Sequence, residues 1–152
     1  MKYRTHSIVC NDPKDSFEHG AIICEQYQQY KEAFSEIQNQ LPKAFVKEFL
    51  KEGFHDNQIG KIELLKVRKN GNMIYNVTIW LEDASDYEIK HVLTFENTTK
   101  ASLDIQQEYS DDLLVCEILA VNEHTLSFEA LLSSDSTVYL EFSKLRYQTQ
   151  RA

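Results

Sequence analysis

The stretch of residues 62–81, IELLKVRKNGNMIYNVTIWL, decides the fold class. Much of it alternates apolar with polar residues, and this period of two indicates β-strands rather than helices. Asn70-Gly71 lies near its centre, and Asn-Gly is typical of a type I′ turn because both residues accept positive φ angles. The sequence therefore predicts a hairpin in which residues 62–67 pair antiparallel with residues 75–81.

Further strands follow this hairpin at short intervals. Segments rich in turn residues, at 82–86, 96–100, 122–124 and 133–136, separate alternating apolar segments. Strands joined by such tight turns pair antiparallel, because parallel pairing needs a crossover connection of a dozen or more residues. We expect a meander that closes with the strand at 138–142 and leaves a polar, frayed tail from residue 148.

Two helices are predicted before the meander. Between residues 16 and 40 apolar side chains recur every three or four positions, which is one face of an α-helix. These positions are Ile23, Tyr27, Tyr30, Phe34, Ile37 and Leu41. A shorter helix is expected to begin at Pro42 and to end at Gly53 as its C′ residue. The predicted fold class is α+β, a single domain over residues 1–152 with both helices packed on one face of an antiparallel meander of about six strands.

Composition excludes several classes of function. The chain has 152 residues and a net charge of −8, which disfavours nucleic acid and anionic membranes as partners. No apolar run near the amino terminus is long enough for a signal peptide or a membrane span, so a cytoplasmic location is expected. Three widely spaced cysteines indicate neither a disulfide framework nor a zinc site, and Cys24 and Cys116 are expected to be buried thiols. Without a GxGxxG or GxxxxGK[ST] motif, no cofactor is predicted.

The clearest local candidate for a functional site is His55-Asp56, in the connection between the second helix and the first strand. An adjacent carboxylate would fix the tautomer of an imidazole, and the pair could contribute two ligands to a metal ion. His19, near the start of the first helix, is a further candidate. In the structural alternative, which we favour, Asp56 caps the turn and His55 bonds a backbone carbonyl. No metal site is predicted.

A second candidate is an acidic interaction surface. Residues 82–112 contain nine acidic and two basic residues, which is close to the whole net charge of the chain. Turns at one end of a sheet would gather these acids, although solvated loops explain them equally well. The proposed surface comprises Glu82, Asp83, Asp86, Glu88, Asp111 and Asp112. Its charge allows a basic protein partner.

Two segments carry a resemblance to known proteins. They are Gln26-Tyr27-Gln28-Gln29-Tyr30, leading through Leu41-Pro42 to the second helix, and Phe54-His55-Asp56-Asn57-Gln58-Ile59 before the strands. The chain resembles, over about residues 20–95, small uncharacterised bacterial proteins known as domains of unknown function, and some immunity proteins of polymorphic toxin systems. The resemblance implies an α+β fold and no particular activity.

Two functions are expected from these observations. The favoured one is a non-enzymatic binding protein, in its most specific form an immunity-type inhibitor that uses the acidic surface. The alternative is a small enzyme or a ligand- or metal-binding domain that uses His55 and Asp56. The sequence is compatible with a homo-oligomer, and the fold class alone does not decide between the two functions.

Overall fold

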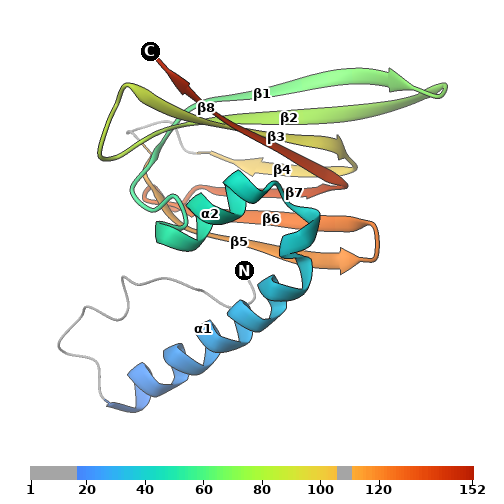
Figure 1. The fold of residues 1–152 in the computed structure, drawn as a ribbon. Helices are drawn as coiled ribbons and strands as arrows, with labels where there is room; N and C mark the ends of the chain where they lie inside the picture. The colour runs from blue at the N-terminus through green and yellow to red at the C-terminus, as the bar shows by residue number, and fades with distance from the viewer. Residues whose placement is uncertain (1–16, 106–110) are drawn as a thin grey trace.

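The computed structural model describes residues 17–105 and 111–152. Within them the chain forms two α-helices, a short 3₁₀ helix and eight strands (Figure 1). The helices are α1 (Phe17–Ile37), η2 (Gln38–Gln40) and α2 (Lys43–Glu52). The strands are β1 (Gln58–Lys69), β2 (Asn72–Glu82), β3 (Ile89–Thr98), β4 (Lys100–Asp104), β5 (Leu113–Asn122), β6 (Thr125–Leu132), β7 (Thr137–Phe142) and β8 (Lys144–Arg151).

The strands form two antiparallel sheets, with the orders β1-β2-β3-β8 and β4-β7-β6-β5. The α+β class is confirmed, but the single meander of about six strands is wrong. The chain leaves the first sheet after β3, because β4 pairs with β7, and it returns after Ser143, because β8 pairs with β3. The alternation of apolar and polar residues predicts each strand, but it does not show which of the two sheets the strand joins.

The carboxyl-terminal segment is a strand and not a frayed tail. The whole of β8 pairs with β3, from Glu96 opposite Lys144 to Ile89 opposite Arg151. Leu145 is buried on the side of β8 that faces the core, and Tyr147 is partly buried there. These contacts and the strand pairing with β3 hold the segment in place, although its polar composition predicted that it would be frayed.

One hydrophobic core includes residues of both helices and both sheets. Phe95 of β3 joins the sheets, because its ring lies 4.9 Å from the rings of both Phe128 and Phe142. Cys116 is buried, as expected, and its thiol donates to the Gly53 carbonyl at 3.2 Å. Burial raises the pKa of the Cys116 thiol above its usual range, so the thiol stays protonated. The side chain of Cys24 lies outside the described residues.

The helices do not share one face of one sheet. α1 packs on β5, where the Ile118 N–H donates to the Tyr30 hydroxyl at 3.0 Å, and α2 packs on β8, where the Phe45 and Tyr147 rings lie 5.8 Å apart. The two helices therefore contact different sheets (Figure 1). The predicted stripe is buried from Tyr30 onward, but Tyr27 is 43% exposed, and the Ile23 side chain lies outside the described residues.

No helix in the described part of the chain has the length and apolar character needed to cross a membrane.

The predicted hairpin is confirmed. β1 and β2 pair from Lys69 opposite Asn72 back to Gln58 opposite Glu82. Asn70 has a φ of 50° and Gly71 a φ of 80°, so both turn residues lie in the left-handed region, as a type I′ turn requires.

We expect Phe34→Ala to lower the free energy of unfolding by about 3–5 kcal/mol, because the removed ring leaves a cavity in the core. Phe34 is buried and stacks on Phe49 with the ring centroids 5.0 Å apart. Leu50→Ala on α2 is the matched control, because that side chain is exposed, and it should change stability by less than about 0.5 kcal/mol. Urea unfolding measures both values, and equal losses would contradict the packing of α1.

We expect Gly71→Val to lower the free energy of unfolding by about 1–2 kcal/mol, because a β-branched residue resists a positive φ. A Cβ atom at this position would meet no other atom within 4 Å, so the backbone angle alone carries the cost. Gly71→Asn should cost less, since Asn tolerates the left-handed region. If both variants unfold at the wild-type urea concentration, the assigned turn type is wrong.

Candidate functional site

His55 and Asp56 lie in the turn between α2 and β1. His55 Nδ1 is 2.9 Å from Asp56 Oδ2, so the two adjacent side chains interact. Phe54 and Asp56 both have a positive φ, of 60° and 63°. No group of three or more His, Cys, Asp or Glu side chains that could hold a metal ion occurs in residues 17–105 and 111–152. His19 belongs to α1, but its side chain lies outside the described residues.

The same turn is fixed to two distant segments. The Asp56 N–H donates to the Leu113 carbonyl at 3.0 Å, and the Leu113 N–H donates to the Asn57 carbonyl at 2.9 Å. The buried side chain of Asn57 accepts a hydrogen bond from the Ala84 N–H at 3.0 Å. The turn that carries His55 and Asp56 therefore also holds the start of β5 and the β2–β3 connection in place.

A second polar cluster, Asp83, His91 and Tyr147, joins the β2–β3 connection to β3 and β8. His91 Nε2 lies 2.9 Å from Asp83 Oδ2, and His91 Nδ1 lies 2.7 Å from the Tyr147 hydroxyl oxygen. The His91 side chain is only 4% exposed. His91 alternates with Ile89 and Leu93 in the sequence, which is typical of a strand, but Tyr147 lies next to the predicted tail, so the sequence did not indicate the cluster.

The protonation states in this cluster follow from its surroundings. Burial alone would raise the pKa of Asp83, but hydrogen bonds from Ser85, from His91 and from the backbone N–H groups of Ser85 and Asp86 hold it well below its usual range. Burial, followed by the negative charges of Glu48 and Asp83, raises the pKa of Tyr147 to about 12. Tyr147 therefore keeps its proton, and Asp83 stays ionised and accepts a hydrogen bond from His91 Nε2–H.

Several of the predicted acidic residues interact within the chain. Glu82 lies 3.3 Å from Lys90, and Arg151 lies 3.6 Å from Asp86 and 3.3 Å from Glu88. Asp111 Oδ1 accepts a hydrogen bond from the Ser134 N–H at 3.2 Å. Asp112 Oδ1 is buried and has no hydrogen-bond partner within the described residues. Cationic and N–H partners thus already compensate much of the charge on this candidate surface.

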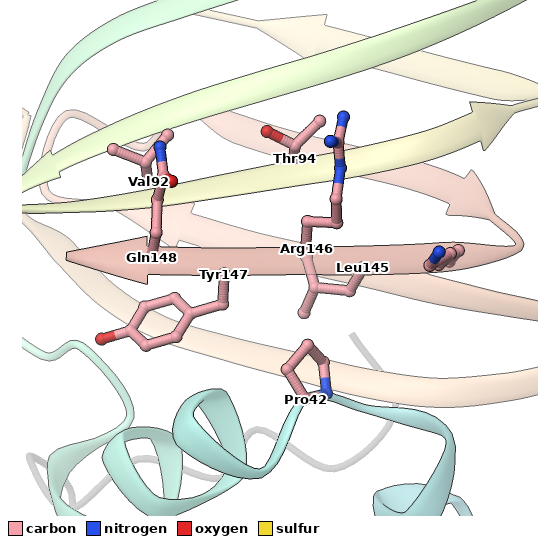
Figure 2. Close-up of a pocket in the computed structure, with 8 residues that line it drawn as sticks. Pro42, Val92, Thr94, Leu145, Arg146, Tyr147 and Gln148 are labelled. Carbon is pink, nitrogen blue, oxygen red and sulfur yellow. The ribbon is translucent and has the colours of Figure 1, made fainter.

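A groove of about 510 Å³ follows β8 (Figure 2). Pro42, Leu145 and Tyr147 lie on one side of β8, and Val92, Thr94, Arg146 and Gln148 lie on the other. The Tyr147 hydroxyl points away from Pro42 and Arg146, because it bonds His91. Lys144 and Arg146 both pair with Glu96, at 3.8 Å and 2.6 Å. The charged side chains and the tyrosine hydroxyl of the groove therefore already have partners within the chain, and few polar groups are left to bind a small ligand.

The distal part of the β1–β2 hairpin, residues 64–77, is here called the arm. Pairing of β2 with β3 ends at Tyr75 opposite Thr98, so residues 67–74 extend beyond β3 (Figure 1). The arm exposes large apolar side chains, namely Leu64, Leu65, Met73 and Tyr75. It also carries three exposed basic residues and no acidic residue. The alternation of apolar and polar residues predicted the two strands of the arm. Whether their apolar side chains are exposed depends on which other strands lie beside them, and the sequence pattern does not show this.

We expect Asp83→Asn to lower the free energy of unfolding at pH 7 by about 1–3 kcal/mol, because the charge-assisted hydrogen bonds weaken. A depressed folded pKa stabilises the protein above the unfolded pKa of about 4, and the effect is lost as the pH falls further. The difference between wild type and variant should therefore shrink below about pH 4. Urea midpoints measured from pH 7 to pH 3 test this.

Glu88→Gln is the matched control, because it neutralises an exposed carboxylate in the same connection that pairs with Arg151 on the surface. It should have little effect at any pH, since exposed ion pairs contribute little to stability. A loss for Asp83→Asn that does not vary with pH would show that the carboxylate charge is not what stabilises the cluster.

Comparison of the chain with known protein families, with curated proteins and with solved structures finds no match. The resemblance to small bacterial proteins and immunity proteins therefore stays a prediction. The function is argued below from the contacts of the chain itself.

Proposed function

We propose that this chain is a non-enzymatic binding protein that contacts a protein partner through the arm. The observation that carries the proposal is the exposure of neighbouring apolar residues at the point where the hairpin leaves β3. Leu64, Met73 and Tyr75 share one face of the hairpin and are 53%, 44% and 38% exposed, and Leu65 on the other face is 57% exposed. Clustered exposed apolar side chains with charged neighbours are typical of protein interaction sites.

The arrangement of the sheets explains why these residues lack cover. Leu64 lies in the same row as Val77 and Phe95, which are both fully buried. It is the last member of that row, at the edge of the first sheet, and its side chain is exposed where theirs are not. A partner that packs on the arm would cover Leu64 and remove its side chain from water.

The arm supports this proposal better than the acidic surface does. An immunity-type inhibitor with an acidic surface requires carboxylates that are free to meet a basic partner. Glu82, Asp83 and Asp86 already have cationic or histidine partners within the chain. The alternative of a small enzyme rests on the His55-Asp56 pair, whose turn also fixes the fold.

A photo-crosslinking experiment tests the proposal in cells that produce the protein. We expect p-benzoylphenylalanine in place of Leu65 to give a discrete adduct with one protein partner, because position 65 lies in the interface. The matched control is the same replacement of Val121, which is 46% exposed near the tip of the β5–β6 hairpin. That control should give no such adduct.

Adding Leu64→Ser and Met73→Ser to the position-65 variant should reduce the adduct at least about tenfold, as expected when the apolar centre of an interface is lost. Circular dichroism checks that the fold is kept. Equal adduct yields from positions 65 and 121, or no adduct from either, would overturn the proposal.

A further inference from the structure

We infer that the arm binds an acidic, extended segment of its partner, which adds as a strand to the outer edge of β1. This inference rests on the proposed function and names the chemistry of the partner. Three features carry it: a strand edge and three basic residues that have no partners among the described residues, and the alternation of side chains along β1.

The outer edge of β1 is occupied only at its base. The Ile59 N–H donates to the Asp111 carbonyl at 3.2 Å, and Gln58 forms a bridge with Asp112. A bulge at Gly60 follows, where the register with β2 shifts. Beyond it, no strand within residues 17–105 and 111–152 pairs with the outer edge at 61–69. This edge spans about 30 Å at 3.3 Å per residue.

The edge strands of the second sheet are shorter or covered. Tyr30 bonds the Ile118 N–H of β5, and the turn at residues 53–57 bonds Leu113 at the start of the same strand. β4 has only five residues, with Lys100 and Asp104 at its ends. Short, charged or covered edges are the usual protection against unwanted strand pairing. β1 is long and apolar as well as basic, so its edge is suited to accept a strand.

The basic residues of the arm differ from the other basic residues in the described strands. The others each have a carboxylate within 4 Å: Lys61, Lys90, Lys100, Lys144, Arg146 and Arg151. Lys66, Arg68 and Lys69 have no acidic partner among the described residues, and all three are exposed. In a chain with a net charge of −8, this is an uncompensated positive surface. It favours a negatively charged partner.

Alternation along β1 defines the pattern of the partner segment. Lys66 and Arg68 lie on the same face as Leu64, whereas Leu65, Val67 and, at the end of the strand, Lys69 lie on the opposite face. A strand added to this edge places its side chains beside those of β1 on the same faces. Its carboxylates would meet Lys66 and Arg68, and its apolar residues would meet Leu65 and Val67. The predicted segment therefore alternates acidic and apolar residues.

The same charges disfavour a second copy of the chain as the occupant. Two β1 edges paired with each other at their distal halves would bring Lys66 and Arg68 close to basic residues of the other copy, and like charges on paired strands are destabilising. Lys69 adds to this repulsion. A negatively charged partner segment avoids this repulsion.

A peptide experiment tests the inference on the full chain. The probe is a nine-residue fluorescent peptide that alternates Val with Glu, and fluorescence anisotropy measures its binding. We expect saturable binding at one peptide per chain. A peptide with Lys in place of Glu should bind at least about tenfold more weakly, because its charges repel the arm. N-methylation of alternate residues should weaken binding similarly, because it removes the backbone donors of the added strand.

The double variant K66E/R68E should reverse the preference between the Glu and Lys peptides. The matched control is K43E/K47E on α2, which changes the net charge equally at two exposed lysines and should leave the preference unchanged. Hydrogen exchange should show new protection of amides within residues 61–69 when the Glu peptide binds.

Equal weakening by both double variants, or no effect of N-methylation, would show non-specific charge attraction and overturn the inference. Tighter binding of a ten-nucleotide oligo-dT than of the Glu peptide, lost in K66E/R68E, would overturn it in favour of a nucleic acid. If the Glu peptide does not bind but the adduct at position 65 forms, the inference fails and the proposed function stands. Absence of both would remove both proposals.

Discussion

The backbone hydrogen bonds between the turn at residues 53–57 and the start of β5 are the joint on which the two sheets depend. The Asp56 N–H donates to the Leu113 carbonyl, the Leu113 N–H donates to the Asn57 carbonyl, and the Cys116 thiol donates to the carbonyl of Gly53. These contacts satisfy backbone polar groups at the end of α2 while they bring β1 and β5, from different sheets, together. The helix end, both sheets and the entry to the β1–β2 hairpin therefore share one anchoring point.

The Asp83, His91 and Tyr147 cluster extends these contacts across the first sheet to β8 at its opposite edge. The buried ring of Phe54 lies 5.2 Å from the His91 ring and 6.1 Å from the Tyr147 ring. Each polar atom of the imidazole has a partner, so the buried histidine carries no unsatisfied group. A fully bonded chain of this kind fixes how β8 sits beside β3 and contributes specificity to the fold as well as stability.

Local chemistry was predictable from the sequence, and long-range pairing was not. Asn70-Gly71 specifies a hairpin through its own backbone preferences, so its position and register follow directly from two residues. Tyr27 has the right helical spacing but lies before the part of α1 that contacts the core, which no periodicity reveals. The cluster around His91 needs Tyr147, 56 residues away, and that partner becomes visible only when β8 is paired with β3. The arm is predictable as a hairpin but not as an exposed one.

The length of the arm has an electrostatic consequence. The body of the protein is acidic, and an acidic segment approaching it would be repelled at short range. From Tyr75, where β3 stops, to the turn the hairpin runs on for about 10 Å at 3.4 Å per residue. Screening at physiological ionic strength acts over about 8 Å, so the tip lies at the limit of the field from the body. On a shorter hairpin Arg68 and Lys69 would lie closer to the acidic residues of the body, and projection of the strands separates these opposite charges.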